Sequence, residues 1–335
     1  MKKTSIHDVA KLAGVSIATV SKALNNSPVV TPETKKRVIE AANQLNYVPN
    51  RASKQLKSGQ TNTISFFTTS IAAPYFANLA DVMAREVSKR GYSFNIFLST
   101  DRQTLINNIL GHSMDGLIGF VDLIDNEIIQ LLKDYRIKTV FIDRAIEAET
   151  IGSVIFDSYQ KGKEMTEYLI QLGHRKIGFV KSFDGIYDSD ERMRGYTDAL
   201  VEAGIAVDQS LILQGNFAQN ISYIEMKNFI KRNREALPTA IFAGNDLSAV
   251  GVIQAVEESG LRVPDDMSVV GFDDLDYLQY FKPRLTTIYN PINLQGELVV
   301  DHLIKLIEGK TEGQTIELPG RLIVRESSKS ITIKQ

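Results

Sequence analysis

Hydrophobic residues recur at helical spacing in the first part of the chain, and this pattern predicts three short helices. In the first, residues 9–13 carry an apolar stripe. Ser5 can cap the start of this helix, with Asp8 three residues later as the returning carboxylate. Gly14 is expected to end it, because glycine accepts the left-handed conformation that a tight turn requires.

The second helix is expected to run from its cap, Ser16, to about Asn25, with Val20 and Leu24 facing inward. Its other face carries Ile17, Ala18, Thr19, Ser21, Lys22 and Asn25. These side chains are small, hydroxylic, amide or cationic, which is typical of a helix that contacts base edges in the major groove of DNA. A helical hairpin inside a core would show the same spacing, so this stretch alone leaves both interpretations open.

The third helix favours a self-contained domain. It begins at Thr31-Pro32-Glu33, where a cap, a proline at the first helical position and an early acid mark a helix start. Its expected buried stripe is Val38, Ile39, Ala42 and Leu45. Three such helices form a small all-α headpiece over residues 1–48.

Residues 49–60 connect this headpiece to the rest of the chain. Within the stretch NRASKQLKS only Ala52 and Leu56 are apolar, and nine residues form at best a marginal helix in isolation. Composition alone therefore indicates a flexible linker. A lone leucine in a basic segment suits a wedge between base steps of the minor groove.

From residue 61 onward, short apolar runs alternate with amphipathic stretches. The expected strands are 64–67, 94–98, 116–120, 139–142, 177–180, 240–243 and 269–272. The expected helices are 76–90, 102–112, 125–134, 158–172, 192–203, 219–233, 246–259 and 293–308. This βαβ repetition predicts parallel sheets covered by helices on both faces, and the length favours two sheets of about six strands each.

Composition narrows the class of protein. The chain has 335 residues and no cysteine, which excludes thiolate metal sites, disulfides and thiol nucleophiles. The N-terminus has no secretory signal, and no apolar run is long enough for a membrane span. We therefore expect a cytoplasmic protein without a membrane partner.

Charge is distributed unevenly. The first 60 residues contain ten lysines and arginines and three acids, a charge of +7, whereas the whole chain carries −2 and the remainder therefore −9. A basic head on an acidic body suits a head that docks on phosphate and a body that stays away from it.

Polar and aromatic residues recur beyond the carboxyl ends of the expected strands, where open parallel sheets bind ligands. They are Tyr75, Phe76, Asp143, Arg192, Asn245, Asp246 and Asp273. Such groups can hydrogen-bond sugar hydroxyls and cover the apolar face of a sugar ring. Asp246 could instead cap the next helix, and Arg192 could form a structural ion pair. Three carboxylates against one arginine favour a neutral sugar over an anionic ligand such as a sugar phosphate.

The run VAKLAGVSIATVSKALNNSPVVTPETKKRVIEAANQLNYVPN resembles the headpiece of LacI/GalR-type bacterial transcription regulators. The resemblance continues along nearly the whole chain. Arg192 and Gly195-Tyr196 match the family's RxxGY motif, Asn245-Asp246 match its ND, and Asp273 matches its GFDD. In members of this family these positions contact the effector, the small molecule that changes affinity for DNA.

The resemblance implies a helix-turn-helix headpiece (1–48), a hinge helix (49–60) and an α/β body (61–335) with the two-lobed fold of periplasmic sugar-binding proteins. The first lobe would comprise about 61–157 and 289–320, and the second about 158–288 and 321–335. The implied DNA-contacting residues are Thr4, Ser5, Ser16, Ile17, Ala18, Thr19, Ser21, Lys22, Asn25, Tyr47, Asn50, Ala52 and Leu56. Lys22 stands where many members carry arginine, so the resemblance does not give the operator sequence.

We therefore expect a homodimeric repressor of carbohydrate-utilisation genes. It would bind a pseudopalindromic double-stranded operator under the control of a small neutral sugar held between the lobes. The alternatives are a regulator that uses a phosphoprotein or purine corepressor, and a sugar-processing enzyme. The enzyme is disfavoured because the four histidines are scattered and no nucleophile or phosphate-loop motif is present. No catalytic residue, cofactor or metal site is expected.

Overall fold

The structure is a computed structural model that describes residues 4–48, 59–111, 113–120, 123–142 and 144–331. The chain divides into two units, Met1–Thr61 and Asn62–Gln335, called here the headpiece unit and the body. Asn50, Ala52, Leu56 and Asp143, which the sequence singles out, lie outside the described residues.

Three helices form the headpiece, as the hydrophobic pattern predicts: α1 (Ile6–Ala13), α2 (Ile17–Leu24) and α3 (Pro32–Gln44). Val9, Val20 and Val38 are fully buried where the three helices meet. The predicted inward face of α3 is wrong in one position. Ile39 is 47% exposed, and Ala41 packs into the core instead.

The predicted helix caps at Ser5 and Ser16 and the predicted turn at Gly14 are confirmed. The backbone N–H and the hydroxyl of Ser5 both donate to Asp8 Oδ2, at 2.9 and 2.7 Å. Gly14 adopts a φ of 64°, which ends α1 in a left-handed turn. Ser16 Oγ accepts a hydrogen bond of 3.1 Å from the N–H of Thr19 and so caps α2.

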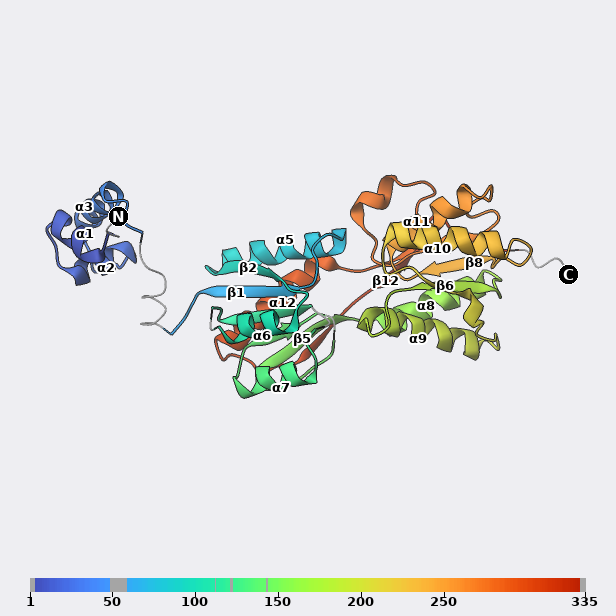
Figure 1. Cartoon of the computed structure of the whole chain (residues 1–335), viewed down its shortest axis with the longest axis horizontal. Coiled ribbons are helices and arrows are strands. Elements are labelled where there is room, and N and C mark those ends of the chain that lie inside the picture. Colours follow the sequence, from blue (N-terminus) through green and yellow to red (C-terminus); the bar gives the residue numbers. More distant parts are fainter. Residues whose placement is uncertain (1–3, 49–58, 112, 121–122, 143, 332–335) are drawn as a thin grey trace. The chain divides into compact units, whose positions relative to one another are not determined.

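The first lobe of the body is built on a parallel six-stranded sheet (Figure 1). Its strand order is β11-β5-β4-β3-β1-β2. The strands are β1 (Thr63–Thr68), β2 (Ser93–Leu98), β3 (Gly116–Phe120), β4 (Thr139–Phe141), β5 (Ile151–Phe156) and β11 (Thr315–Leu318). The helices are α5 (Pro74–Lys89), α6 (Arg102–Leu110), α7 (Asn126–Asp134) and α12 (Ile292–Ile307).

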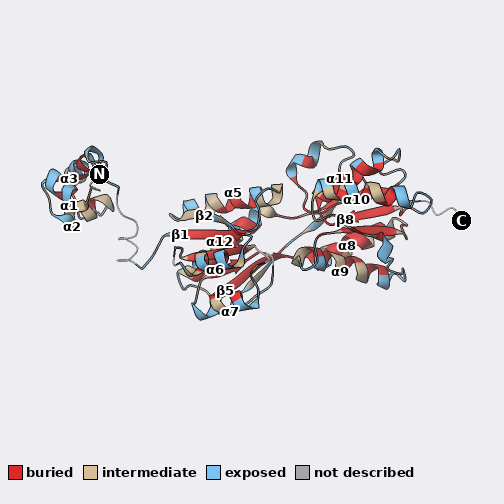
Figure 2. Cartoon of the chain, viewed as in Figure 1, coloured by how far each residue is buried: buried red, intermediate tan, exposed pale blue. Residues whose placement is uncertain are grey.

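Helices cover both faces of this sheet because successive strand residues point to opposite sides. Phe66 and Val140 belong to the core cluster shared with α5 and α12, whereas Phe67 and Phe141 belong to the cluster shared with α6 and α7. The inner strands β1, β3, β4 and β5 are accordingly buried along most of their length (Figure 2), whereas the edge strands β2 and β11 are not.

The second lobe is built on a parallel four-stranded sheet with the order β7-β6-β8-β9. The strands are β6 (Ile177–Lys181), β7 (Ile212–Gln214), β8 (Ala240–Ala243) and β9 (Ser268–Val270). The α-helices are α8 (Ser158–Gln171), α9 (Tyr187–Glu202), α10 (Gln219–Arg232) and α11 (Asp246–Glu257), with 3-10 helices η1 (Gln209–Leu211) and η2 (Asp276–Tyr280).

The expectation of about six strands in the second sheet is therefore wrong for the described residues. The strands that would have completed it, β10 (Thr287–Tyr289) and β12 (Arg321–Ile323), pair with each other in a separate antiparallel ribbon. They belong to segments that connect the lobes, since β10 precedes α12 and β12 follows β11, both in the first lobe.

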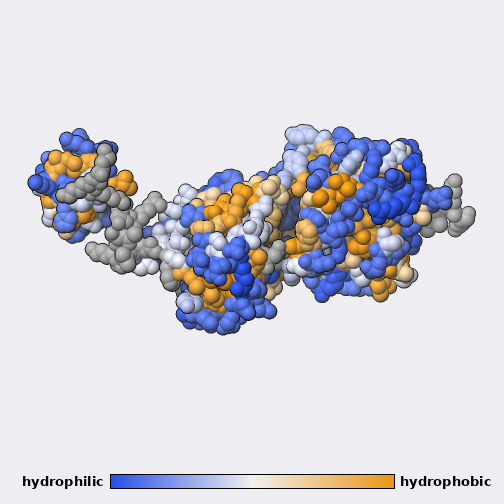
Figure 3. Space-filling view, in the orientation of Figure 1, coloured by the Kyte–Doolittle hydropathy of each residue, from blue (hydrophilic) through white to orange (hydrophobic). Residues whose placement is uncertain are grey.

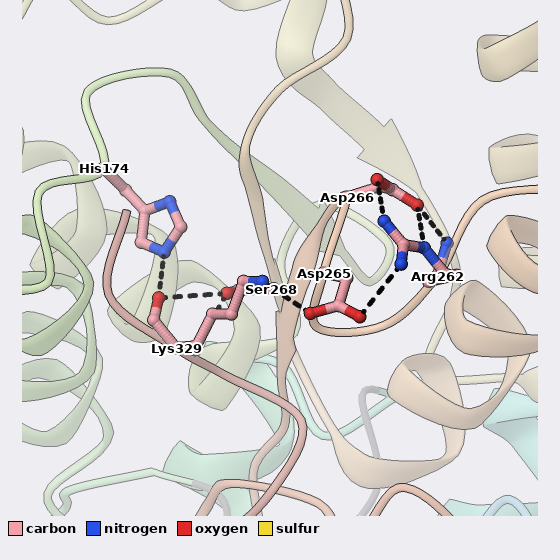
Figure 4. A network of polar contacts seen from close by, with 6 residues as sticks. All are labelled: His174, Arg262, Asp265, Asp266, Ser268 and Lys329. Atoms are coloured by element: carbon pink, nitrogen blue, oxygen red, sulfur yellow. Dashed lines mark hydrogen bonds and ion pairs between the residues drawn. The ribbon is translucent and has the colours of Figure 1, made fainter. Parts of the chain in front are cut away.

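The C-terminal segment is fastened to the second lobe by a polar network (Figure 4). The buried His174 has Nδ1 2.9 Å from Thr239 Oγ1 and Nε2 3.1 Å from the carbonyl of Lys329. The Lys329 ammonium pairs with Asp265 at 2.5 Å. The network holds residues 327–331 against the end of α8 and the start of β9.

Hydrophilic residues cover most of the visible surface of the body, with hydrophobic residues gathered in smaller patches (Figure 3). Within the described residues, no helix is both long and apolar enough to cross a membrane.

Candidate functional site

The outward face of α2 is polar and accessible. Ile17, Ala18, Lys22 and Asn25 are exposed, whereas Thr19 and Ser21 are half-buried. The hydroxyls of Ser16 and Thr19 lie 2.8 Å apart at the start of the helix. Small side chains around one lysine leave the helix free to approach base edges closely.

Three other predicted DNA-contacting residues hold the headpiece together. Thr4 Oγ1 donates to the carbonyl of Leu45 at 3.2 Å, which ties the start of the described chain to the end of α3. Tyr47 packs half-buried against the headpiece core. Ser5 is engaged with Asp8 as the cap of α1.

Each sheet of the body has one switch point, where two neighbouring strands lead to helices on opposite faces of the sheet. These switch points lie between β1 and β3 in the first lobe and between β6 and β8 in the second. Open parallel sheets bind ligands beyond the strand ends at such points. Tyr75 and Phe76 follow β1, and Arg192 and Asn245 follow β6 and β8.

The RxxGY segment positions Arg192 through the packing of α9. A Cβ at Gly195 would collide with the carbonyl of Tyr159 in α8, and a Cβ at Gly162 would lie 2.7 Å from the carbonyl of Arg192. Both positions therefore need glycine for α8 and α9 to lie this close. Tyr196 is fully buried and donates to the carbonyl of Ile177 at 2.7 Å, which anchors α9 to β6.

Arg192 is buried, with 4% exposure, and its guanidinium touches several groups. It stacks 3.7 Å from the centroid of Phe272 and donates to the carbonyl of Gly244 at 2.6 Å. Its Nη2 lies 3.8 Å from Asp273 Oδ1. That separation is an ion pair without a hydrogen bond, so Arg192 keeps donor capacity and Asp273 keeps acceptor capacity for a ligand.

Asp273 sits in a strained turn. Its φ is 115° and that of Asp274 is 54°, both in a region that non-glycine residues rarely adopt. The turn is held by the N–H of Asp273, which donates to the carbonyl of Ile288 at 2.9 Å. Burial raises the pKa of Asp273 to about 6, although the nearby Arg192 acts to lower this pKa.

Asn245 and Asp246 bond to the protein itself. Asn245, not Asp246, is the cap of α11, since its side chain accepts from the N–H of Ser248 at 2.9 Å. Asp246 accepts from Thr287 Oγ1 at 2.6 Å and from the N–H of Leu275 at 2.9 Å, and it is 1% exposed. Both carboxylate oxygens thus support the segments around Asp273. Burial and the charge of Asp273 raise the pKa of Asp246 to about 8.

The predicted aromatic pair, Tyr75 and Phe76, packs together and against Phe120. The rings of Tyr75 and Phe76 meet edge to face at 5.2 Å between centroids, and Phe76 meets Phe120 at 4.7 Å. The hydroxyl of Tyr75 donates to Gln295 Oε1 at 2.7 Å. Burial, with smaller contributions from Asp188 and Asp273, raises the pKa of Tyr75 well above its ordinary value.

A cavity of about 380 Å³ lies between the lobes beside these residues. Its lining includes Phe120 and Arg144 from the first lobe and Tyr187, Asp188 and Glu191 from α9. Its size is within the range of about 300–1,000 Å³ for small-molecule sites. We call this cavity and the residues around Arg192 and Asp273 the cleft.

Asp188 is the residue that sequence reasoning missed. It accepts from Ser158 Oγ at 2.6 Å, lines the cavity, and acts on the pKa of both Tyr75 and Asp273. The expected start of this helix at residue 192 is wrong, because α9 begins at Tyr187. With the correct start, the i to i+4 spacing places Asp188 on the same helix face as Arg192.

The structure thus gathers Tyr75, Phe76, Arg192 and Asp273 around the cleft, while Asn245 and Asp246 lie beside it with their side chains bonded to the protein. Within the described residues, no group of three or more His, Asp or Glu side chains could hold a metal ion. The groups present can donate and accept hydrogen bonds and stack on an apolar ring face.

Comparison with known proteins matches each of the two units to a family model. Residues 5–50 match the family model described as "Bacterial regulatory proteins, lacI family", and residues 166–328 match "Periplasmic binding protein-like domain". The chain is 33% identical to the probable HTH-type transcriptional repressor ExuR of Bacillus subtilis (strain 168), covering 98% of this chain and 99% of that protein. It is 35% identical to the HTH-type transcriptional repressor PurR of Edwardsiella ictaluri (strain 93-146), covering 96% of each chain.

Solved structures of transcriptional regulators also resemble this chain over nearly its whole length. A lac repressor bound to ONPG in its repressed state matches with a TM-score of 0.84 and 28% identity, over 98% of this chain and all of that one. A transcriptional regulator CelR in complex with cellobiose matches with a TM-score of 0.72 and 29% identity, over 97% of this chain and all of that one. The two-lobed body with an N-terminal helix-turn-helix is therefore confirmed.

Proposed function

This chain belongs to the lacI family of bacterial regulatory proteins, and we propose that it is a dimeric repressor whose operator binding is controlled by a neutral sugar held in the cleft. Family membership makes it a DNA-binding transcriptional regulator and not an enzyme. It acts in the cytoplasm, where the bacterial chromosome lies.

The pairing of Arg192 with Asp273 is the observation that carries the effector proposal. At 3.8 Å the two groups neutralise each other's charge without using up their hydrogen-bonding capacity. A sugar hydroxyl accepts from a guanidinium and donates to a carboxylate at the same time. The strain stored at Asp273 supports the same interpretation, because unusual backbone conformations concentrate at ligand sites.

The charge of the cleft disfavours an anionic ligand. The charge of Asp188 acts to raise the pKa of Asp273, and Asp190 and Glu191 add acidic groups to the cavity wall. A phosphate or carboxylate placed among them would meet like charge at low dielectric, which is costly. Among related structures, the complex of CelR with cellobiose shows that a fold of this kind holds a neutral sugar.

The effector proposal is tested with thermal shifts of the full-length protein against neutral sugars, sugar phosphates and nucleobases. A neutral sugar is expected to stabilise the body, and Arg192→Ala and Asp273→Ala are expected to abolish that shift while operator binding persists. Arg232→Ala, at an exposed arginine of the second lobe, is the matched control and should keep the shift. A purine or a sugar phosphate as the sole stabilising ligand would contradict the neutral-sugar proposal, and sugar binding unchanged in both cleft variants would contradict the site.

The DNA-binding proposal is that α2 enters the major groove of each half of a pseudopalindromic operator, with Lys22 as its cationic contact to base edges or phosphate. The proposed contacts are Thr4, Ser5, Ser16, Ile17, Ala18, Thr19, Ser21, Lys22, Asn25 and Tyr47, together with Asn50, Ala52 and Leu56. Binding-site selection followed by footprinting should give two half-sites related by a twofold axis. Lys22→Ala should relax the preferred sequence, whereas Lys36→Ala, on the exposed side of α3, should leave it unchanged. A footprint without twofold symmetry would contradict the proposal.

The dimer is proposed to form through the first lobe. Strand β2 is the edge strand of its sheet, and the outward residues Ile96 and Leu98 are 38% and 56% exposed. Exposed apolar side chains on a sheet edge mark a surface that associates with a partner. Leu98→Lys should therefore lower the sedimentation mass from two chains to one at micromolar concentration. A variant that stays dimeric would place the interface elsewhere.

A further inference from the structure

A second and smaller cavity, of about 80 Å³, lies where residues of both lobes meet a connecting segment. It is separate from the larger cavity, with which it shares no lining residue. Its volume exceeds the roughly 15 Å³ that one water requires and is well below the roughly 300 Å³ of the smallest typical small-molecule sites. We call it the junction cavity. It has room for an ion or a few waters and not for an organic effector.

Oxygen-bearing side chains dominate the wall of the junction cavity. Two are carboxylates and three are amides: Asp274, Asp276, Asn78, Asn290 and Asn293. Asn78 belongs to α5 and Asn293 to α12, both in the first lobe, whereas the two acids follow β9 of the second lobe. Carboxylate and amide oxygens are the ligands that hard metal cations prefer. With two acids and no histidine, this set differs from a group of three or more His, Asp or Glu, which the described residues do not contain.

Asn290 gives the main evidence that the junction cavity holds a ligand. It is 5% exposed, and among the residues that the structure describes its Oδ1 has no hydrogen-bond partner. Its side chain bonds to the carboxyl of Asp273 and acts to lower the pKa of that group, so the amide nitrogen is the donor there. Turning the amide over to satisfy Oδ1 would break the bond to Asp273. Since Asn290 lines the cavity and Asp273 does not, Oδ1 is left on the cavity side.

Three further oxygen ligands are not engaged elsewhere. Within the part of the chain that the structure describes, the side chains of Asn78, Asn293 and Asp276 have no hydrogen bond or ion pair. All three residues are exposed, so their side chains can turn toward an ion in the cavity. A water could satisfy Asn290 Oδ1 alone, but a set of acceptors without a matching set of donors favours a cation.

The charge of the wall decides between a monovalent and a divalent ion. Asp274 is paired with Arg325 at 2.7 Å, which leaves Asp276 as the uncompensated charge. Helix α12 begins at Ile292 beside the cavity, and the partial positive charge of a helix N-terminus, about half an elementary charge, opposes any cation. One uncompensated carboxylate against this dipole can balance one positive charge and not two.

We propose that the junction cavity binds a monovalent metal cation, sodium or potassium. Its ligands are Asn290 Oδ1, the carboxylate of Asp276 and the amide oxygens of Asn78 and Asn293. Because these ligands come from both lobes, the ion stabilises the lobe arrangement that brings them together. It also holds the amide whose nitrogen bonds to Asp273. The site requires neither a sugar nor DNA, so it goes beyond the proposed function and does not depend on it.

The test is thermal unfolding of the full-length protein, without DNA or sugar, in sodium chloride, potassium chloride or choline chloride at equal ionic strength. Choline carries the same charge, but it is a bulky organic cation that does not suit so small a cavity. Sodium or potassium should raise the melting temperature above the choline value by about 2–5 °C once its concentration is tenfold above its dissociation constant. Asp276→Asn and Asn293→Leu should each abolish this difference. Both residues are exposed, so the fold should tolerate the changes.

Two exposed residues outside the junction cavity provide matched controls. Asp134→Asn in α7 and Asn107→Leu in α6 should keep the difference between the salts. Equal melting temperatures in all three salts would mean that the cavity holds only water, and would overturn the proposal. A difference that persists in Asp276→Asn and Asn293→Leu would overturn the site. In a parallel titration, stabilisation by calcium chloride alone that both variants lose would overturn the monovalent assignment. With no sugar present, each of these results leaves the neutral-sugar proposal to its own test.

Discussion

The carboxyl group of Asp246 makes the stability of the body depend on pH. It is buried, and its pKa is raised to about 8, so the folded protein carries it protonated at neutral pH. A protonated Asp246 can donate to the hydroxyl of Thr287 and accept from the N–H of Leu275. Asparagine in the same position offers an N–H and a carbonyl oxygen to the same two partners. Asp246→Asn therefore imitates the protonated acid without its titration.

The sign and size of the effect follow from proton linkage. The unfolded chain releases the Asp246 proton near pH 4, whereas the folded protein holds it up to about pH 8. The stability that this group contributes is therefore fully present below pH 4 and is lost as the pH rises to 8. Each pH unit in this window changes the free energy of unfolding by about 1.4 kcal/mol, which makes about 4 kcal/mol between pH 4 and 7.

Urea denaturation followed by circular dichroism between pH 5 and 8 measures this slope. Asp246→Asn should flatten it by up to about 1.4 kcal/mol per pH unit and should match or exceed the unchanged protein in stability at pH 7.5. Asp246→Ala should be destabilised at every pH, since the buried groups of Thr287 and Leu275 lose their hydrogen-bond partner at about 1–3 kcal/mol each. Asp134→Asn, at an exposed acid of α7, is the control for the loss of one charge. An unchanged slope in Asp246→Asn, or a loss as large as that of Asp246→Ala, would refute the reasoning.

Three further predictions concern the elements that hold the site. Tyr196→Phe should lower the free energy of unfolding by about 1–3 kcal/mol in denaturant titrations, because the carbonyl of Ile177 loses its buried donor. Gly195→Ala should lower the free energy of unfolding by about 1–3 kcal/mol and weaken effector binding, because the new methyl group drives α9 away from α8. A stable variant with normal effector affinity would show that the two helices can separate without loss. Asp8→Ala should destabilise the headpiece by about 1 kcal/mol and weaken operator binding in a mobility-shift assay, because Ser5 loses its capping partner.

Local signals were sufficient to predict the headpiece. The caps at Ser5 and Ser16 and the turn at Gly14 act within a few residues of sequence, and the structure reproduces each of them. The prediction that Ile39 is buried was wrong because an apolar residue on a small domain often stays exposed. Helical spacing alone does not decide which of two neighbouring positions faces inward.

In the body, strand positions were predictable and pairing was not. β5 was missed because Gly152 and Ser153 interrupt its apolar run. That glycine is needed because a Cβ there would collide with Nε2 of His302. The separate pairing of β10 with β12 depends on segments that lie far apart in the sequence. Neither feature leaves a local pattern.

The sequence predicted where the site residues lie better than it predicted what each side chain binds. Tyr75 and Arg192 follow strands at the switch points, and Asp273 follows β9 at the same edge of the second sheet, which topology alone indicates. The sequence left the acid that follows Asn245 open to two interpretations, a ligand contact or a helix cap. Its two hydrogen bonds run to residues 275 and 287, and no spacing in the sequence could reveal them.

The C-terminal segment that completes both lobes has a consequence for the order of synthesis. β11 joins the first sheet beside β5, and Ile331 donates to the carbonyl of Leu172 in the second lobe at 2.9 Å. Neither lobe can therefore be finished until the ribosome has made almost the whole chain, whereas the headpiece needs only its own first residues. At about 5–20 residues per second the delay is roughly 15–60 s. A ribosome that stalls late thus leaves a chain with a folded DNA-binding head and an unfinished body.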